Sequence, residues 1–355
     1  MSDRAEVKKA LDNVIKKARV HLYKPIQIAE ILYKHRTEPD SVDLTDIETY
    51  RSKSKKWRDI ICLELLGRTS TSSAKFQDNL FDDNAVPPAV LIELGKDNIR
   101  TGGAIEAYIY RQFTNRYSQM AQALDYVLEA TTDSFDVKVF IDSFRYEAGL
   151  KRSIDKIYEI VVYALFSTLV NALDLQVEIS IDIDKQEILT EFSDFASMVM
   201  NLDIHILTKK QNAKVYRIGV TNAADRGLDM YSNWGPAIQV KHLNLNEELA
   251  EGIVNNVTSD KIIIVCKDAD ERLILSLLNQ LGWRSRIQSI ITESNLYTWY
   301  NKALCGTYAK NLGEELLTCL CEEIIHEFPS IDEMPEILKA RGYESIYDDF
   351  WVELN

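Results

Sequence analysis

The period of the apolar residues changes near residue 174, and this change constrains the fold more than any other feature of the sequence. Upstream of it, apolar residues recur every three or four positions, the spacing of one helix face. Downstream, residues 177–181 alternate between apolar and polar as a half-buried strand does. The sequence therefore predicts an α/β (α+β) protein in which a mainly helical region, residues 1–174, precedes a mixed sheet.

The N-terminal region is expected to be helical. Short helices are predicted at residues 5–19, after Pro25, around Ile60–Leu66 and before Gly102, and two long ones at Ala104–Ala130 and Ile154–Leu173. Both long helices carry more apolar surface than an isolated helix tolerates in water. They are expected to pack together, either inside one subunit or across the boundary of a dimer.

A sheet-forming region is expected over residues 175–310, with a helical extension over 311–355. After the first alternating run, a helix is predicted at residues 188–200. The later strands are predicted at Val215–Val220, Leu228–Ser232, Ala237–Leu243, Lys261–Cys266 and Ile287–Ile291. Helices at Glu247–Val254 and Glu271–Leu281 separate the last three strands, which predicts a mixed sheet with helices on its faces.

The charge of the chain is acidic overall but unevenly distributed. The net charge is −14, which argues against indiscriminate binding to nucleic acid. Residues 1–75, however, carry a net charge of +5, and residues 205–245 carry +4. An acidic body with two basic regions is typical of a protein that binds DNA at one defined place.

The strongest basic cluster occupies residues 50–58. It contains five cations: Arg51, Lys53, Lys55, Lys56 and Arg58. Two interpretations remain open at this stage, a surface that contacts DNA phosphates and the solvated start of a helix.

The cysteines and the apolar runs set the expected compartment. The five cysteines have no paired CxxC spacing and lie mostly in apolar runs, so we expect reduced thiols in the core rather than a zinc site. No uncharged stretch approaches the ~18 apolar residues that a membrane-spanning helix needs. The sequence predicts a cytoplasmic protein without a membrane partner.

The candidate catalytic residues are Asp229, Gln239 and Lys241. The chain between them reads as a hairpin whose turn lies at residues 233–236. Residues two apart on a strand share a face, so Gln239 and Lys241 project together while Val240 points into the core. Asp229 joins them only if it lies opposite one of the two, which requires an odd number of loop residues, such as 233–235.

This arrangement resembles the PD-(D/E)XK nucleases, with Gln239 in place of the second acid. The resemblance implies that Asp229, the side-chain oxygen of Gln239 and the Val240 carbonyl bind Mg²⁺, and that Lys241 orients or deprotonates the attacking water. Because the amide removes a negative charge, another carboxylate is expected to compensate. Asp225 and Glu191 are the candidates.

A longer stretch of sequence resembles the HaeII family of restriction endonucleases. The similarity covers residues 221–243 and extends to residues 20–25, 69–74 and 282–283. It implies a Type II enzyme of a restriction-modification system that acts as a homodimer. Such an enzyme cuts both strands of double-stranded DNA at a short palindrome of the purine-GCGC-pyrimidine type. Arg226, within the most similar stretch, is expected to contact DNA.

Other functions fit the same residues. Asp229 and Lys241 could form an ordinary surface ion pair on a hairpin. The chain could also be a repair or recombination nuclease of the same superfamily, or a DNA-binding module whose metal site has decayed at Gln239. A purely helical scaffold would leave the hairpin unexplained.

Overall fold

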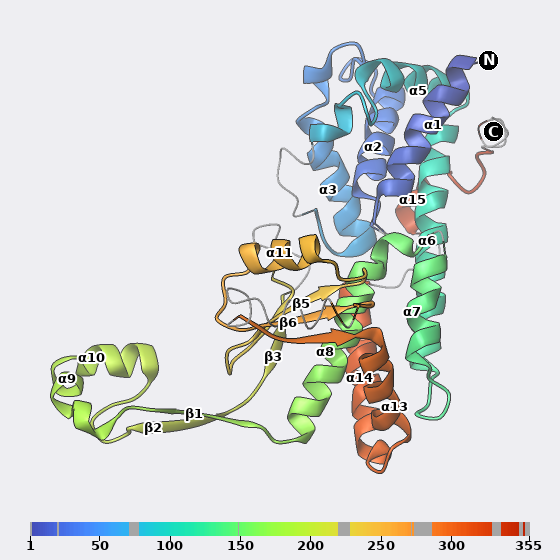
Figure 1. Ribbon diagram of the computed structural model, residues 1–355. Coiled ribbons are helices and arrows are strands. Elements are labelled where there is room, and N and C mark those ends of the chain that lie inside the picture. The colour runs from blue at the N-terminus through green and yellow to red at the C-terminus, as the bar shows by residue number, and fades with distance from the viewer. Residues whose placement is uncertain are drawn as a thin grey trace.

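The structure is a computed structural model. It describes residues 2–19, 21–70, 78–147, 149–218, 228–270, 272, 286–328, 335–347 and 351. The ribbon shows a helical body, a sheet at one end of it and a long arm that projects from the sheet side (Figure 1). The expectation of a mixed helix and sheet protein is confirmed.

The N-terminal half is helical, as its apolar period predicts. Its helices are α1 (Ser2–Lys17), α2 (Tyr23–Thr37), α3 (Lys53–Leu66), α5 (Pro88–Arg100), α6 (Ala104–Leu128), α7 (Val137–Tyr146) and α8 (Ile154–Ala172), with 3-10 turns at Ile47–Thr49, Asn79–Phe81 and Lys151–Ser153. Pro25 falls in the first turn of α2, where its missing N–H breaks no intrahelical bond.

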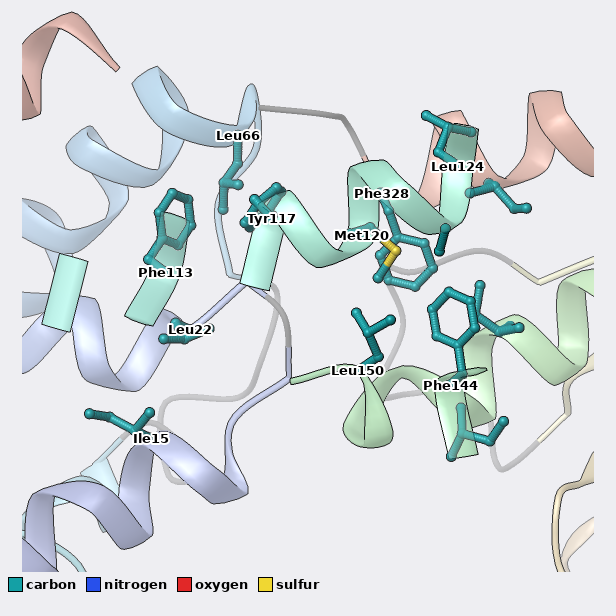
Figure 2. Close-up of a cluster of buried hydrophobic side chains, with 14 of the residues drawn as sticks. Ile15, Leu22, Leu66, Phe113, Tyr117, Met120, Leu124, Phe144, Leu150 and Phe328 are labelled. Carbon is teal, nitrogen blue, oxygen red and sulfur yellow. The ribbon is translucent and has the colours of Figure 1, made fainter. Parts of the chain in front are cut away.

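The long helix α6 packs against α2, α5 and α7. Figure 2 shows Phe113, Tyr117 and Met120 of α6 among buried side chains of other elements, including Leu22 and Phe328. Helix α8 is likewise buried along much of its length. The expectation that these two helices pack on each other is wrong, because both pack on the C-terminal helix α14 (Ala309–Glu327) instead. The alternative that they form a dimer contact is also wrong, because their apolar faces are covered within the subunit.

The C-terminal helices pack onto the same body. They are α13 (Glu293–Cys305), α14 (Ala309–Glu327) and α15 (Glu336–Ala340), and α14 lies against α6 and α8. The guanidinium of Arg217 sits between Glu323, at 2.7 Å, and Glu327, at 3.0 Å. Arg217 is almost fully buried, so these ion pairs fasten the first strand of the main sheet to α14.

The main sheet has five strands in the order β3-β4-β5-β6-β7. They are β3 (Val215–Arg217), β4 (Met230–Ser232), β5 (Ala237–Lys241), β6 (Ile262–Cys266) and β7 (Ile287–Thr292). The first three are antiparallel and the last three parallel, which confirms the mixed sheet.

Helices cover both faces of this sheet. Helix α8 packs against β3 and β5, and α11 (Glu247–Asn256) covers the opposite face. The side chains of Ile238 and Val240 join the large core on the α8 side, whereas Ala237 joins the smaller cluster beside α11. The helix expected at Glu271–Leu281 lies outside the described residues, apart from Arg272.

The arm is the part of the fold that the sequence predicts least well. It contains β1 (Gln176–Ser180), β2 (Thr208–Asn212), a 3-10 turn (Ile183–Lys185), α9 (Gln186–Glu191), α10 (Ser193–Phe195) and a π-helical turn (Ala196–Met200). The predicted first strand is present, but it pairs with β2 in a separate two-stranded sheet. The single helix expected at residues 188–200 is interrupted at Phe192, whose backbone leaves the helical region.

Candidate active site

The hairpin between β4 and β5 sets the geometry of the site. Met230 pairs with Ile238 and Tyr231 with Ala237, so the same register places Asp229 opposite Gln239. The turn includes Gly235, whose φ of 128° is rarely adopted by other residues. The expectation that an odd-numbered loop aligns Asp229 with Gln239 is confirmed.

The Asp229 carboxylate takes the place of a backbone carbonyl as the acceptor for a main-chain N–H near the end of β5. Strand β4 begins at Met230, and the Val240 N–H donates to Asp229 Oδ2 at 2.8 Å instead of to a strand carbonyl. In an antiparallel ladder the N–H and the C=O of one residue point to the same side. The Val240 carbonyl therefore faces the same edge as the Asp229 carboxylate.

Lys241 completes a three-way contact at this edge. Its Nζ donates to Asp229 Oδ2 at 3.1 Å, and its side chain remains 30% exposed. The Asp229 side chain is 15% exposed. An ordinary surface ion pair would need no backbone partner. Here the Val240 amide and the Lys241 ammonium hold the same oxygen, so the carboxylate has a fixed orientation next to solvent.

Gln239 lies on the same face of β5 as Lys241, as the alternation predicts. It is only 2% exposed and sits beside the buried Ile264 of the neighbouring strand. A buried amide is stable only where its polar atoms are hydrogen-bonded, so the surroundings of Gln239 fix the orientation of its side chain.

A buried carboxylate on α8, not among the residues expected from the sequence, lies within electrostatic range of Asp229. Burial raises the pKa of Glu159 to about 7, and the negative charge of Asp229 contributes to the increase. Lys156 Nζ donates to Glu159 Oε2 at 2.6 Å and acts in the opposite direction. The signal was present in the sequence, because Glu159 is an acid within the apolar run of α8.

A second polar pair joins the start of α8 to the end of β5. His242 Nδ1 lies 2.5 Å from Asp155 Oδ1, and this hydrogen bond is the main cause of the lowered pKa of Asp155. His242 therefore faces α8, on the side of the sheet where Val240 is buried.

The two candidates for an additional acid are not brought to this edge. Glu191 is exposed at the end of α9 in the arm, so it cannot complete the site of its own chain. That expectation is wrong, because residues 188–200 do not precede the main sheet directly but belong to the projecting arm. Asp225 and Arg226 lie outside the described residues.

The basic cluster is only partly available at the surface. Lys53 and Lys56 are exposed, and Arg51 is half exposed with weak contacts to nearby acids. Lys55 forms an ion pair with Asp78 at 2.6 Å. Arg58 is 1% exposed and bonds to its neighbour Asp59 and to Gln27, so its guanidinium is internal.

The described residues contain no group of three or more His, Cys, Asp or Glu side chains arranged to hold a metal ion. The β4–β5 edge offers instead the Asp229 carboxylate together with neutral oxygens. In the same part of the chain, no helix has the length and apolar character to cross a membrane.

A cavity of about 750 Å³ lies at the opposite end of β5, lined by Pro236, Lys261 and Arg286 among others. It is therefore separate from the edge that holds Asp229 and Lys241.

Comparison with known proteins places the whole chain in one family. The family model for the HaeII restriction endonuclease matches residues 7–343. The chain is 56% identical over 332 residues to the Type II restriction enzyme HaeII of Haemophilus aegyptius, with 94% of each protein covered. It is 53% identical over 346 residues to the Type II restriction enzyme NgoBI of Neisseria gonorrhoeae, with 96% of this chain and 97% of that enzyme covered. No solved structure gives a significant match. The chain belongs to the HaeII restriction endonuclease family.

Proposed function

We propose that this protein is a Type II restriction endonuclease that hydrolyses phosphodiester bonds in both strands of duplex DNA at a short palindrome. The observation that carries the proposal is the contact of Asp229 with both the Val240 amide and Lys241 at the start of β4. Its support from relatives is that two proteins more than 50% identical to this chain are named Type II restriction enzymes.

The donors at this edge fit a divalent cation of the Mg²⁺ type. Asp229, Glu159 and the Val240 carbonyl offer only oxygen ligands, which hard cations prefer. Burial and, to a smaller extent, the negative charge of Asp229 raise the pKa of Glu159, and a cation bound nearby would favour its charged form. Gln239 can add its amide oxygen. When bound, Mg²⁺ would stabilise negative charge on the scissile phosphate and lower the pKa of a bound water.

Lys241 positions the nucleophile in this account. Its ammonium is held by Asp229 and remains partly exposed, so it can also reach a water molecule beside the cleaved phosphate. There it donates a hydrogen bond to the water or to the phosphate oxygen as negative charge develops. Asp229 thus has two tasks, because the same carboxylate that would bind the cation also fixes the position of the lysine.

Glu159 supplies the negative charge that Gln239 lacks. Its carboxylate approaches from α8, while Gln239 and Lys241 belong to β5, so two elements contribute to one edge. Lys156 holds one of the Glu159 oxygens and limits its rotation. We assign Glu159 the role that the sequence analysis had expected from Asp225 or Glu191.

DNA binding would use the exposed members of the basic cluster. Lys53 and Lys56 at the start of α3 can contact phosphates, whereas the buried Arg58 supports the helix from inside. A palindrome presents the same half-site twice, so the active species is a two-fold symmetric homodimer with one site for each strand. The target is expected to be of the purine-GCGC-pyrimidine type.

Digestion of a sequenced plasmid tests this proposal. With Mg²⁺ the protein should give discrete fragments whose ends all map to one palindrome. Fragments with random ends would instead favour a repair or recombination nuclease. Intact plasmid under all metal conditions, together with DNA binding, would indicate a non-catalytic DNA-binding module.

A further inference from the structure

An arm formed by residues 174–213 projects away from the body and has no counterpart in the chemistry described above (Figure 1). The arm leaves the body of the protein after α8, and the chain returns from it directly into β3. At its base the Ala213 N–H donates to the Leu175 carbonyl at 2.8 Å, so the two ends of the arm meet. The arm is therefore an insertion between two elements that flank the candidate active site.

The surface of the arm is unusually apolar. Twelve of the twenty-four large hydrophobic residues that are exposed among the described residues lie within residues 173–206. They are Leu173, Leu175, Ile179, Ile183, Ile188, Phe192, Phe195, Met198, Val199, Met200, Ile204 and Ile206. Only Leu189, Ala196 and Leu202 in the same range are buried. The arm exposes more apolar surface than it encloses, which is typical of an interaction surface.

The two faces of the hairpin formed by β1 and β2 differ in polarity. Val177 and Ile179 share one face of the hairpin because they are two residues apart. The opposite face carries the ion pair between Glu178 and Lys210, at 3.0 Å. A two-stranded sheet is barely stable alone in water, so a partner on the apolar face would stabilise it.

The charge of the arm determines what kind of partner fits. Residues 174–213 contain eight acids and three lysines, a net charge of −5. This charge opposes contact with DNA phosphates and with anionic membranes. The partner must therefore be a protein whose surface accepts the apolar side chains of the arm together with the acidic residues around them.

We propose that the arm docks on a second copy of this chain and forms the dimer contact. This inference rests on the proposed function, because cutting both strands of a palindrome requires two sites related by a two-fold axis. The long helices α6 and α8 cannot supply the contact, since their apolar faces are buried within the subunit. The arm begins at α8 and ends at β3, so docking it would also fix one active site relative to the other.

The exposed apolar area is sufficient for a stable dimer. Most of the twelve side chains are about half exposed or more, which leaves each of them on the order of 80 Å² to bury. Burial of about ten such side chains would remove roughly 800 Å² per copy, the size of a standard protein interface.

Sedimentation velocity of the full chain without DNA tests the inference. We expect a dimer at micromolar concentration. The double substitution Met198→Lys with Val199→Lys should weaken association at least tenfold, because both side chains are strongly exposed on the arm. As a matched control, Val139→Lys with Tyr146→Lys alters exposed apolar residues of α7 and should leave the dimer unchanged.

A second variant removes the arm. Residues 176–212 are replaced by Asn-Gly, which can close the gap between the bonded Leu175 and Ala213 with a tight turn. This variant should unfold cooperatively, sediment as a monomer and nick DNA rather than cut both strands. If the point variants fold and stay dimeric, the inference is wrong.

A wild-type protein that is monomeric at all concentrations, with and without DNA, would equally overturn it and point to a different protein as the occupant. Asp229→Ala should remain a dimer, because association needs no cleavage. A dimer that depends on the arm but never cuts DNA would refute the proposed function and leave this inference intact.

Discussion

Replacing Glu159 by Gln should stabilise the protein while it weakens the enzyme. Glu159 is buried in the first half of α8, and its pKa is raised from 4.5 to about 7, mainly by burial. That increase corresponds to roughly 3 kcal/mol against the charged carboxylate. Glutamine keeps the shape and removes the charge, although it also loses the ion pair with Lys156. We expect a net gain of about 1–3 kcal/mol in the free energy of unfolding.

The pH dependence of this gain has a definite sign. The folded-state pKa of Glu159 lies above its unfolded value, so the folded protein holds the extra proton between about pH 4.5 and 7. Stability of the metal-free protein should therefore decrease as the pH rises through this range, and Glu159→Gln should reduce the decrease. Thermal unfolding without Mg²⁺ at pH 6 and pH 8 measures both effects.

The same variant should need more Mg²⁺ for DNA cleavage. Removing one of two neighbouring carboxylates should raise the Mg²⁺ concentration at half-maximal rate by about tenfold or more. The matched control is Glu30→Gln, since Glu30 is also a buried helical acid but pairs with Arg341 far from the sheet. The control should lose stability and keep its Mg²⁺ requirement. A Glu159→Gln protein that is less stable and has an unchanged Mg²⁺ requirement would refute the reasoning and leave Glu159 as a structural partner of Lys156.

Three further predictions follow from the same contacts. Gln239→Glu should keep activity or change the metal preference, and Gln239→Ala should lose most activity; equal rates for both in metal titrations would exclude Gln239 as a ligand. Lys53→Gln with Lys56→Gln should reduce the slope of log affinity against log salt by up to about 1.8, and an unchanged slope would place this helix start away from DNA. Glu327→Ala should cost about 3–5 kcal/mol in chemical denaturation because it leaves Arg217 buried with one partner fewer; a loss under 1 kcal/mol would show that the pair is not fastening β3 to α14.

The parts of the fold that were predictable are those with a strong local period. The positions along the chain of the long helices α6 and α8 and of strands β3 to β7 follow from the spacing of apolar residues, and the loop parity of the β4–β5 hairpin aligns Asp229 with Gln239. These features depend on residues close together in the sequence. The alternating run at residues 177–181 also predicted a strand correctly.

What the sequence could not provide depends on contacts between distant segments. An alternating run does not show which other strand it pairs with. The pairing of β1 with β2 and the projection of the arm were therefore not predicted. Glu159 lies 70 positions before Asp229, and only the packing of α8 against the sheet brings the two carboxylates together. The burial of Arg58 is similar, because it depends on a hydrogen bond with Gln27 on another helix.

Cleavage by the Asp229→Ala and Lys241→Ala variants tests the central claim most directly. Both variants should fold and bind the specific duplex with Ca²⁺ or without metal, since neither side chain is part of the core. With Mg²⁺ each should lose cleavage by roughly a thousandfold or more, because one lacks the carboxylate that binds the cation and the other lacks the ammonium that positions the water. Discrete cutting at the wild-type rate by either variant would show that the edge between β4 and β5 is not the catalytic centre.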